Sequence, residues 1–263
     1  MTSMYRVTHR MFQTAFSMTQ HQQQSKLATG IRLLDEVLGG GFERGLSYLL
    51  YGSPECTRLL QRSIACALRQ VGQSHGIAVI DANNGIRPNV ILNHLRIHPI
   101  SAPPAAYLNQ LHVARAFTTD QLLSLLGDAP DTIHSLNAPI LFVHGLMHLL
   151  QEEEGGPPSA AGAPPDPRVY RRAQLATHLK QLAFTQQVAV VASADAPKRV
   201  SQPPLRIGQT AFHRFHVLIR HTRHDTVDTV TLEKHPSRPW QQRSTVSARS
   251  RRRRGAQQTT LFD

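Results

Sequence analysis

The sequence predicts an α/β fold in which a mainly parallel sheet has helices on both faces. Short apolar runs of strand length alternate along the chain with amphipathic runs of helical spacing, a pattern typical of parallel sheets. The chain has 263 residues, of which 40% are hydrophobic, enough to build one large core. Two apolar runs near the end are joined by a short polar turn, which predicts an antiparallel hairpin at the sheet edge.

Each expected element follows from its local pattern. A helix is expected at 29–38, because Ile31, Leu34 and Leu38 recur on one face and three glycines follow. Short apolar runs predict strands at 46–51, 76–81, 111–114, 139–144 and 188–193. Helical spacing predicts the helices 57–70, 90–95, 119–126 and 170–185, and the edge hairpin is expected at 215–220 and 226–233.

We expect one globular domain with extended ends. Residues 1–26 are polar and rich in Gln and Met, which predicts a flexible N-terminal segment, and residues 27–246 form the predicted core. Within the core, residues 151–167 (QEEEGGPPSAAGAPPDP) have no apolar periodicity, which predicts a disordered loop. The strands on either side continue one pattern, so this loop does not separate two domains. Regular patterning is lost near His235, and residues 247–263 form a basic, disordered tail.

Positive charge is concentrated at the two ends of the chain. Residues 1–26 hold three basic residues and no acid, and residues 236–263 hold seven arginines and one acid, so the ends carry +3 and +6 of the formal +12. Such a distribution favours a polyanionic partner such as nucleic acid; the alternative is that the ends only aid solubility. Two cysteines exclude a disulfide framework, and no apolar run is long enough for a membrane span or a signal peptide.

An altered phosphate-binding loop follows the first long strand. A strand, a glycine turn and a helix form the context of the pattern G-x-x-x-x-G-K-[ST], and the chain reads GSPECTRL from Gly52. Thr57, Arg58 and Leu59 take the places of the second glycine, the lysine and the metal-binding hydroxyl. A β-branched residue is stiff where the backbone must curl around phosphate, and leucine cannot hold a metal ion. Gly52, Thr57, Arg58 and Leu59 therefore predict at most a vestigial nucleotide site.

Several segments together resemble the ATPase core of the RecA/RadA recombinase family. They are ATGIRLLDEVLGGGFERG (28–45), IDANNGIRP (80–88), which is similar to the family's I-D-T-E-G-x-F-R-P, and LHVARAF (111–117), which is similar to V-A-R-A-Y. The run 139–144 stands where the family has its Walker B strand, and 188–193 stands before the second DNA-binding loop. The resemblance extends over residues 27–246 and implies a RecA-like P-loop core.

The resemblance also implies that the hydrolytic groups are altered. Asn83 stands where the family has the glutamate that positions the attacking water, and an amide cannot act as a general base. His144 stands in place of the aspartate that supports Mg²⁺. We therefore expect no catalytic residue, no cofactor and little or no ATP hydrolysis; the alternative is a weak ATP site that uses Arg58. His144 and His148 lack a carboxylate or cysteine at helical spacing, so no metal site is predicted.

Basic residues predict where DNA would bind. By resemblance, the loops 151–172 and 194–207 face DNA in the family; here they supply Arg168, Arg171, Arg172, Lys198, Arg199 and Arg206. The tail SARSRRRR adds Arg249, Arg251, Arg252, Arg253 and Arg254. Guanidinium groups in such segments neutralise phosphates without reading sequence, so binding should depend strongly on salt. The alternative is ordinary solvated loops.

The chain ends in QQTTLFD, in which Gln258, Leu261 and Phe262 resemble the bacterial sliding-clamp-binding pentapeptide Q-L-x-L-F. Two adjacent large apolar residues in a polar tail gain nothing in water but could fill an apolar pocket, with the glutamine bonding at its rim. This predicts the sliding clamp as a partner; the alternative is an incidental chain end.

The leading prediction is a RecA/RadA-like accessory protein of DNA repair or recombination. It would act in the cytoplasm at the nucleoid and link DNA, and a partner recombinase or polymerase, to the sliding clamp. A divergent DNA-dependent ATPase, a translesion-synthesis accessory protein and a protein-only scaffold remain the alternatives.

Overall fold

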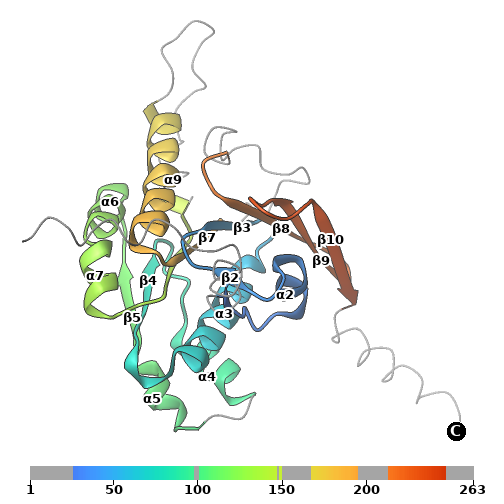
Figure 1. Ribbon diagram of the computed structural model, residues 1–263, viewed down its shortest axis with the longest axis horizontal. Coiled ribbons are helices and arrows are strands. Elements are labelled where there is room, and N and C mark those ends of the chain that lie inside the picture. Colours follow the sequence, from blue (N-terminus) through green and yellow to red (C-terminus); the bar gives the residue numbers. More distant parts are fainter. Residues whose placement is uncertain (1–25, 98–100, 147, 150–166, 195–212, 247–263) are drawn as a thin grey trace, which may run out of the picture.

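The structure is a computed structural model that describes residues 26–97, 101–146, 148–149, 167–194 and 213–246. Its centre is an eight-stranded sheet in the order β10-β9-β8-β3-β7-β6-β4-β5 (Figure 1). The strands are β3 (Ser47–Tyr51), β4 (Ile77–Asp81), β5 (Leu111–Arg115), β6 (Ile140–His144), β7 (Ala189–Ala194), β8 (Val217–His224), β9 (Val227–Lys234) and β10 (Gln241–Val246). The short strands β1 (Lys26–Leu27) and β2 (Phe42–Glu43) pair separately.

The middle of the sheet is parallel. β3 pairs with β7 and β8, β4 pairs with β5 and β6, and β6 pairs with β7, all in parallel register. Every residue of β3, β4 and β6 is buried, because both faces of the sheet are covered. β9 and β10 continue the sheet in antiparallel register, which leaves β10 and β5 as its two edges.

Helices cover both faces of this sheet (Figure 1). One face is covered by α2 (Arg32–Leu38), α3 (Cys56–Val71), α4 (Pro88–Arg96) and α5 (Pro104–Leu108), and a 3₁₀ turn (Gly72–Ser74) follows α3. The other face is covered by α6 (Thr119–Gly127), α7 (Ala129–Ser135) and α9 (Pro167–Gln186). Because side chains alternate along a strand, Phe142 of β6 packs in the first core and its neighbour Val143 packs in the second.

The predicted fold class is confirmed: a mainly parallel sheet, helices on both faces and an antiparallel hairpin at the C-terminal edge. Differences lie in the periphery. α5 and α7 lie outside the prediction, as do β1 and β2. Lys26, assigned to the flexible segment, lies in β1 and forms an ion pair with Glu43 at 2.8 Å. α9 begins at Pro167, the last residue of the predicted loop, and residues 151–166 lie outside the described residues, as do 1–25 and 247–263.

β10 shows why an edge strand escapes sequence reasoning. The expectation that regular structure ends near His235 is wrong, because β10 pairs with β9 from Gln241 opposite Leu232 to Val246 opposite Val227. Most of β10 is exposed, so it has no apolar alternation to reveal it. The Gln241 side chain donates a hydrogen bond to the Val37 carbonyl of α2 at 2.6 Å, which ties the strand to the domain.

Two further findings concern the described residues as a set. Among them, no helix has both the length and the apolar character needed to cross a bilayer. Both cysteines, Cys56 and Cys66, are free thiols and buried.

Candidate functional site

The turn between β3 and α3 is pressed against the neighbouring strand β8. Gly52 has a φ of 112°, which favours glycine, and a Cβ atom built on it would lie 2.6 Å from the carbonyl oxygen of His221. No other residue fits this close approach without moving β8. The first glycine of the phosphate-loop pattern therefore has a packing role in this fold.

Polar bonds to His221 anchor the same turn. The Ser53 hydroxyl lies 2.6 Å from Nδ1 of His221 and accepts a hydrogen bond from the Glu55 amide at 3.2 Å. On the other side of the ring, Nε2 of His221 lies 3.5 Å from Asp228. Burial lowers the pKa of His221 despite the nearby carboxylates of Asp228 and Glu55, which act to raise it. His221 thus links the turn to β8 and β9 as a neutral ring at neutral pH.

Glu55 is neutralised where it stands in the turn. Its carboxylate accepts from Nε of Arg58 at 3.2 Å and from a terminal nitrogen of Arg223 at 3.1 Å. Arg223 also lies 3.7 Å from Asp228. Arg58, which stands at the lysine position of the pattern, is therefore engaged with a carboxylate of the same turn.

A buried line of hydrogen bonds joins α3, β6 and β4. Nε2 of His144 lies 3.0 Å from the Thr57 hydroxyl, and Nδ1 of the same ring lies 3.0 Å from the Asp81 carboxylate. Both His144 and Asp81 are completely buried. The Thr57 hydroxyl, the imidazole and the carboxylate thus satisfy one another where the strands end.

The Asp81 carboxylate is also held by the backbone. It accepts from the amides of Gly85 at 3.1 Å and Ile86 at 3.0 Å, and Arg115 lies 4.0 Å away. Burial acts to raise the pKa of Asp81, but the hydrogen bonds from His144, Ile86 and Gly85 outweigh it and lower that pKa. Asp81 therefore stays ionised inside the fold.

The backbone packs closely around this line. A Cβ on Gly85 would lie 2.3 Å from Cε1 of His144, and a Cβ on Gly145 would lie 2.7 Å from Cγ of Asn83. Asn83 therefore lies beside Gly145, which follows the last residue of β6, and close to His144 in space although the two are far apart in the sequence. Its Oδ1 is buried and has no hydrogen-bond partner in the structure.

The structure brings together the predicted residues of the phosphate loop and separates others. Thr57 meets His144, Asn83 lies beside the following glycine, and Arg58 and Leu59 line a neighbouring hollow of about 340 Å³. Sequence reasoning missed the partners Asp81, His221 and Arg223. Asp81 had a visible signal, an acid at the end of a strand, but a histidine and an arginine in β8 gave none.

The predicted DNA contacts are described only in part. Arg171 is exposed on α9, whereas the side chain of Arg172 is only 7% exposed and does not face solvent as a phosphate contact would require. The side chain of Arg168 lies outside the described residues, and so do these predicted residues: Lys198, Arg199, Arg206, Arg249, Arg251, Arg252, Arg253, Arg254, Gln258, Leu261 and Phe262.

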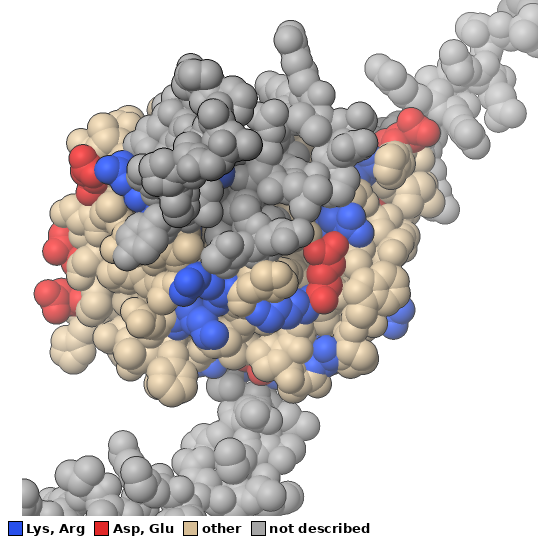
Figure 2. Space-filling view, turned by 90° about the horizontal axis from the view of Figure 1, so that it is seen from above, with Lys and Arg blue, Asp and Glu red and all other residues tan. Residues whose placement is uncertain are grey.

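Charges of both signs share the face seen from above Figure 1. Lys and Arg side chains gather near its middle, and Asp and Glu side chains lie directly beside them (Figure 2). Within the described part of the chain, no group of three or more His, Cys, Asp and Glu side chains could hold a metal ion.

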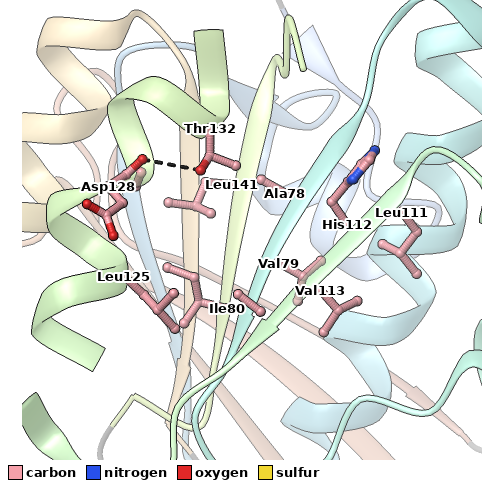
Figure 3. Close-up of a pocket in the computed structure, with 12 residues that line it drawn as sticks. Ala78, Val79, Ile80, Leu111, His112, Val113, Leu125, Asp128, Thr132 and Leu141 are labelled. Atoms are coloured by element: carbon pink, nitrogen blue, oxygen red, sulfur yellow. Dashed lines mark hydrogen bonds between the residues drawn. The ribbon is translucent and has the colours of Figure 1, made fainter. Parts of the chain in front are cut away.

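A second hollow lies far along the sheet, next to its β5 edge. It has a volume of about 390 Å³ and lies between β4, β5 and β6 on one side and α6 and α7 on the other (Figure 3). Its lining is mostly apolar, with His112 at one end and Asp128 at the other. The Asp128 carbonyl accepts from the Thr132 hydroxyl at 3.2 Å, so it is already bonded within the helix pair. No residue of the Thr57 site lines this hollow.

Comparison with known families agrees with this architecture. The family model Rad51 matches residues 20–204 of the chain. The chain belongs to the Rad51 family. The predicted RecA/RadA-like membership is thereby confirmed, and the matched range includes the β3–α3 turn and the ends of β4 and β6. The protein is a RecA-like recombination and repair protein, and DNA is the partner that Rad51 membership indicates. The strands β8, β9 and β10 follow the matched range.

Proposed function

We propose that this Rad51-family protein is a DNA-binding accessory factor that hydrolyses ATP slowly or not at all. The observation that carries the proposal is the buried line from Thr57 through His144 to Asp81. Groups at the positions that should meet phosphate and metal are bonded to one another instead. Phosphoryl transfer depends on positioning and charge neutralisation by such groups. Groups that are hydrogen-bonded to one another are not available to bind phosphate or a metal ion.

The remaining groups do not fit Mg²⁺ and ATP either. Leu59 supplies no hydroxyl, His144 supplies no carboxylate, and Glu55 takes up the charges of Arg58 and Arg223 that could otherwise meet phosphate. The buried Oδ1 of Asn83 is a lone acceptor and attracts no phosphate oxygen. A divergent ATPase that uses Arg58 would first have to break its ion pair with Glu55.

The DNA-binding part of the proposal rests on the family and on the charge of the chain. The formal net charge is +12, and five arginines lie between residues 249 and 254. We propose that this tail and the basic loop 194–207 contact the phosphate backbone, and that Gln258, Leu261 and Phe262 bind a sliding clamp. A partner recombinase or polymerase and a location at the nucleoid complete the proposal; a translesion accessory role or a protein-only scaffold is the competing function.

An ATPase assay of the full chain with Mg²⁺ and single-stranded DNA tests the central point. We expect no turnover above that of a heat-inactivated sample. Turnover that disappears in Arg58→Ala would overturn the proposal in favour of the divergent ATPase. The matched control is Arg44→Ala, which removes the same charge from an exposed residue outside the turn.

The tail is tested separately. Deletion of residues 249–254 should weaken binding to a labelled oligonucleotide and reduce its salt dependence, because each lost phosphate contact lowers the slope by roughly 0.7 to 0.9. Capture of the full chain on an immobilised sliding clamp should be lost in Leu261→Ala/Phe262→Ala. Capture that persists in this variant would remove the clamp from the proposal.

A further inference from the structure

The outward face of α3 carries basic side chains beside two hollows. The 340 Å³ hollow is lined by Arg58 and Arg62, and a smaller hollow of about 240 Å³ is lined by Arg62, Arg69 and His94. Arg62 therefore forms a wall between the two. Arg58, Arg62 and Arg69 come from α3, which packs beside α4, and His94 comes from α4.

The smaller hollow combines basic and apolar lining residues, and Arg62, Arg69 and His94 are the basic ones. Its other lining residues are Gly30, Ala65, Cys66 and Ile97, so no carboxylate faces it. Gly30 has a φ of 71°, and a Cβ there would lie 2.8 Å from Cβ of Cys66, so the chain at Gly30 passes over α3 without a side chain between them. This close approach forms one side of the hollow.

These basic groups have no ionic partner in the described part of the chain. No ion pair there involves Arg62, Arg69 or His94, whereas Arg58 is paired with Glu55 and Arg32 with Glu36. Burial raises the pKa of Asp35 although the charge of Arg62 acts to lower it, and the Asp35 carboxylate accepts the Thr29 amide at 2.7 Å. Nε of Arg69 is buried without a hydrogen-bond partner, and a terminal nitrogen of the same guanidinium donates to Sγ of Cys66 at 3.6 Å, which is a weak acceptor. A basic group that is partly desolvated and unpaired is a costly arrangement unless an anion completes it.

The arrangement fits an extended anion better than a compact one. From Arg58 to Arg69 the helix rises about 16 Å at 1.5 Å per residue, which is close to the length of five nucleotides of one strand at 3.4 Å each. The smaller hollow, at about 240 Å³, is below the roughly 300 to 1,000 Å³ of a pocket that encloses a drug-sized or nucleotide-sized ligand. The larger hollow is also lined by the carboxylates of Glu36, Glu55 and Asp228, so a linear polymer of phosphates fits better over Arg62 and Arg69 beside the smaller one.

We propose that Arg62, Arg69 and His94 form a binding surface for the phosphate backbone of DNA on the outer face of α3. The inference rests on the proposed DNA-binding function and gives that function a place on the folded domain, apart from the tail and the loops. Binding there is independent of base sequence, because guanidinium contacts to phosphate carry no base information.

The test measures binding of the full chain to a fluorescein-labelled oligothymidylate by anisotropy at increasing salt. Arg62→Ala/Arg69→Ala is compared with Arg44→Ala/Lys180→Ala, which removes the same charge from exposed residues outside both hollows. We expect about tenfold weaker binding at low salt and a salt slope lower by roughly 1.4, from two lost contacts at 0.7 each, for the first variant only. Thermal melts establish that both variants fold, and Arg62→Glu, at an exposed position, serves if Arg69→Ala destabilises the domain.

The outcomes separate the two proposals. A wild-type chain that does not bind oligothymidylate overturns the DNA-binding function itself. Wild-type binding with equal affinity and slope in both double variants overturns only the surface on α3. Unchanged DNA binding together with lost binding to polyglutamate also overturns it, and would identify an acidic polypeptide as the ligand.

Discussion

The charged side chains at the beginning of α3 are paired with one another, whereas, among the described residues, those along its outer face are not. At its beginning, Glu55, Arg58 and Arg223 neutralise one another, and Thr57 is bonded to a buried histidine. Along its outer face, Arg62 and Arg69 have no carboxylate within ion-pair distance in the described residues. The comparison teaches that a phosphate-loop position in the sequence is a poor guide to where an anion can bind, because internal partners decide it.

The largest expected effect comes from pushing the β3–α3 turn, at the beginning of α3, away from β8. Gly52→Ala adds a methyl group 2.6 Å from the His221 carbonyl at a φ of 112°, so we expect a loss of about 3 kcal/mol in the free energy of unfolding. Urea denaturation measures it. Gly72→Ala, at a φ of 66° with nothing within 4 Å, reports the strain alone, and Gly127→Ala reports the added methyl alone. A loss in Gly52→Ala no larger than in Gly72→Ala would show that the close approach to β8 has no energetic consequence.

The next largest effect concerns the buried line. Asp81→Ala leaves His144 and the amides of Gly85 and Ile86 without their acceptor, so we expect a loss of about 3 kcal/mol. Asp81→Asn keeps the shape and one acceptor and should lose less. The same urea titration applies, with exposed Asp120→Ala as the control. Equal stability of Asp81→Ala and Asp120→Ala would mean that the hydrogen bonds from Thr57 through His144 to Asp81 do not stabilise the fold.

The fold could be predicted from the sequence because the buried strands are recognisable as short apolar runs. β3, β4, β6 and β7 are covered on both faces and are continuous apolar runs, which only a few structures accommodate. β10 gave no such signal, since an exposed edge strand is specified by its partner β9 and by one side-chain bond from Gln241.

The residues of the site could be predicted from the sequence, but the hydrogen bonds and ion pairs between them could not. Thr57 and Arg58 were identified from the phosphate-loop pattern, Asn83 and His144 from the resemblance to the RecA/RadA family, and the structure places Thr57 against His144. That His144 would be bonded to Asp81, and Arg58 to Glu55, could not be read, because both pairings depend on side-chain directions at strand and helix ends. The basic face of α3 was missed for a related reason: its arginines are unremarkable until it is known that Arg62 and Arg69 form no ion pair within the described part of the chain.

Loss of one negative charge at the beginning of α3 should leave Arg58 as available to DNA as Arg62 is. Glu55→Gln removes the negative charge that pairs with Arg58 and Arg223, and Arg58 lines the same hollow as Arg62. We expect DNA affinity at low salt to rise about threefold, with stability changed by less than about 1 kcal/mol because the ion pairs are partly exposed. Anisotropy with labelled oligothymidylate measures the affinity. Glu36→Gln, which frees the paired Arg32 of the same hollow, is the matched control for net charge. A rise confined to Glu36→Gln would place the DNA on α2 and contradict the comparison.

The smallest expected effect is a pH dependence carried by His221. Burial lowers its pKa below the usual value, against the raising influence of Asp228 and Glu55 and with the help of Arg223 and Arg58. The unfolded chain then binds the proton more readily than the folded one, so the stabilisation is fully present above about pH 6.5 and is lost as the pH falls through the folded pKa. His94, His216 and His235 have pKa values lowered by burial in the same direction, so they share the slope. His221→Gln should therefore flatten, without abolishing, the fall in urea midpoint between neutral and mildly acidic pH. An unchanged slope in His221→Gln would mean that His221 binds its proton equally well in the folded and the unfolded chain. The contact between the turn and β8 would then be insensitive to the charge of His221.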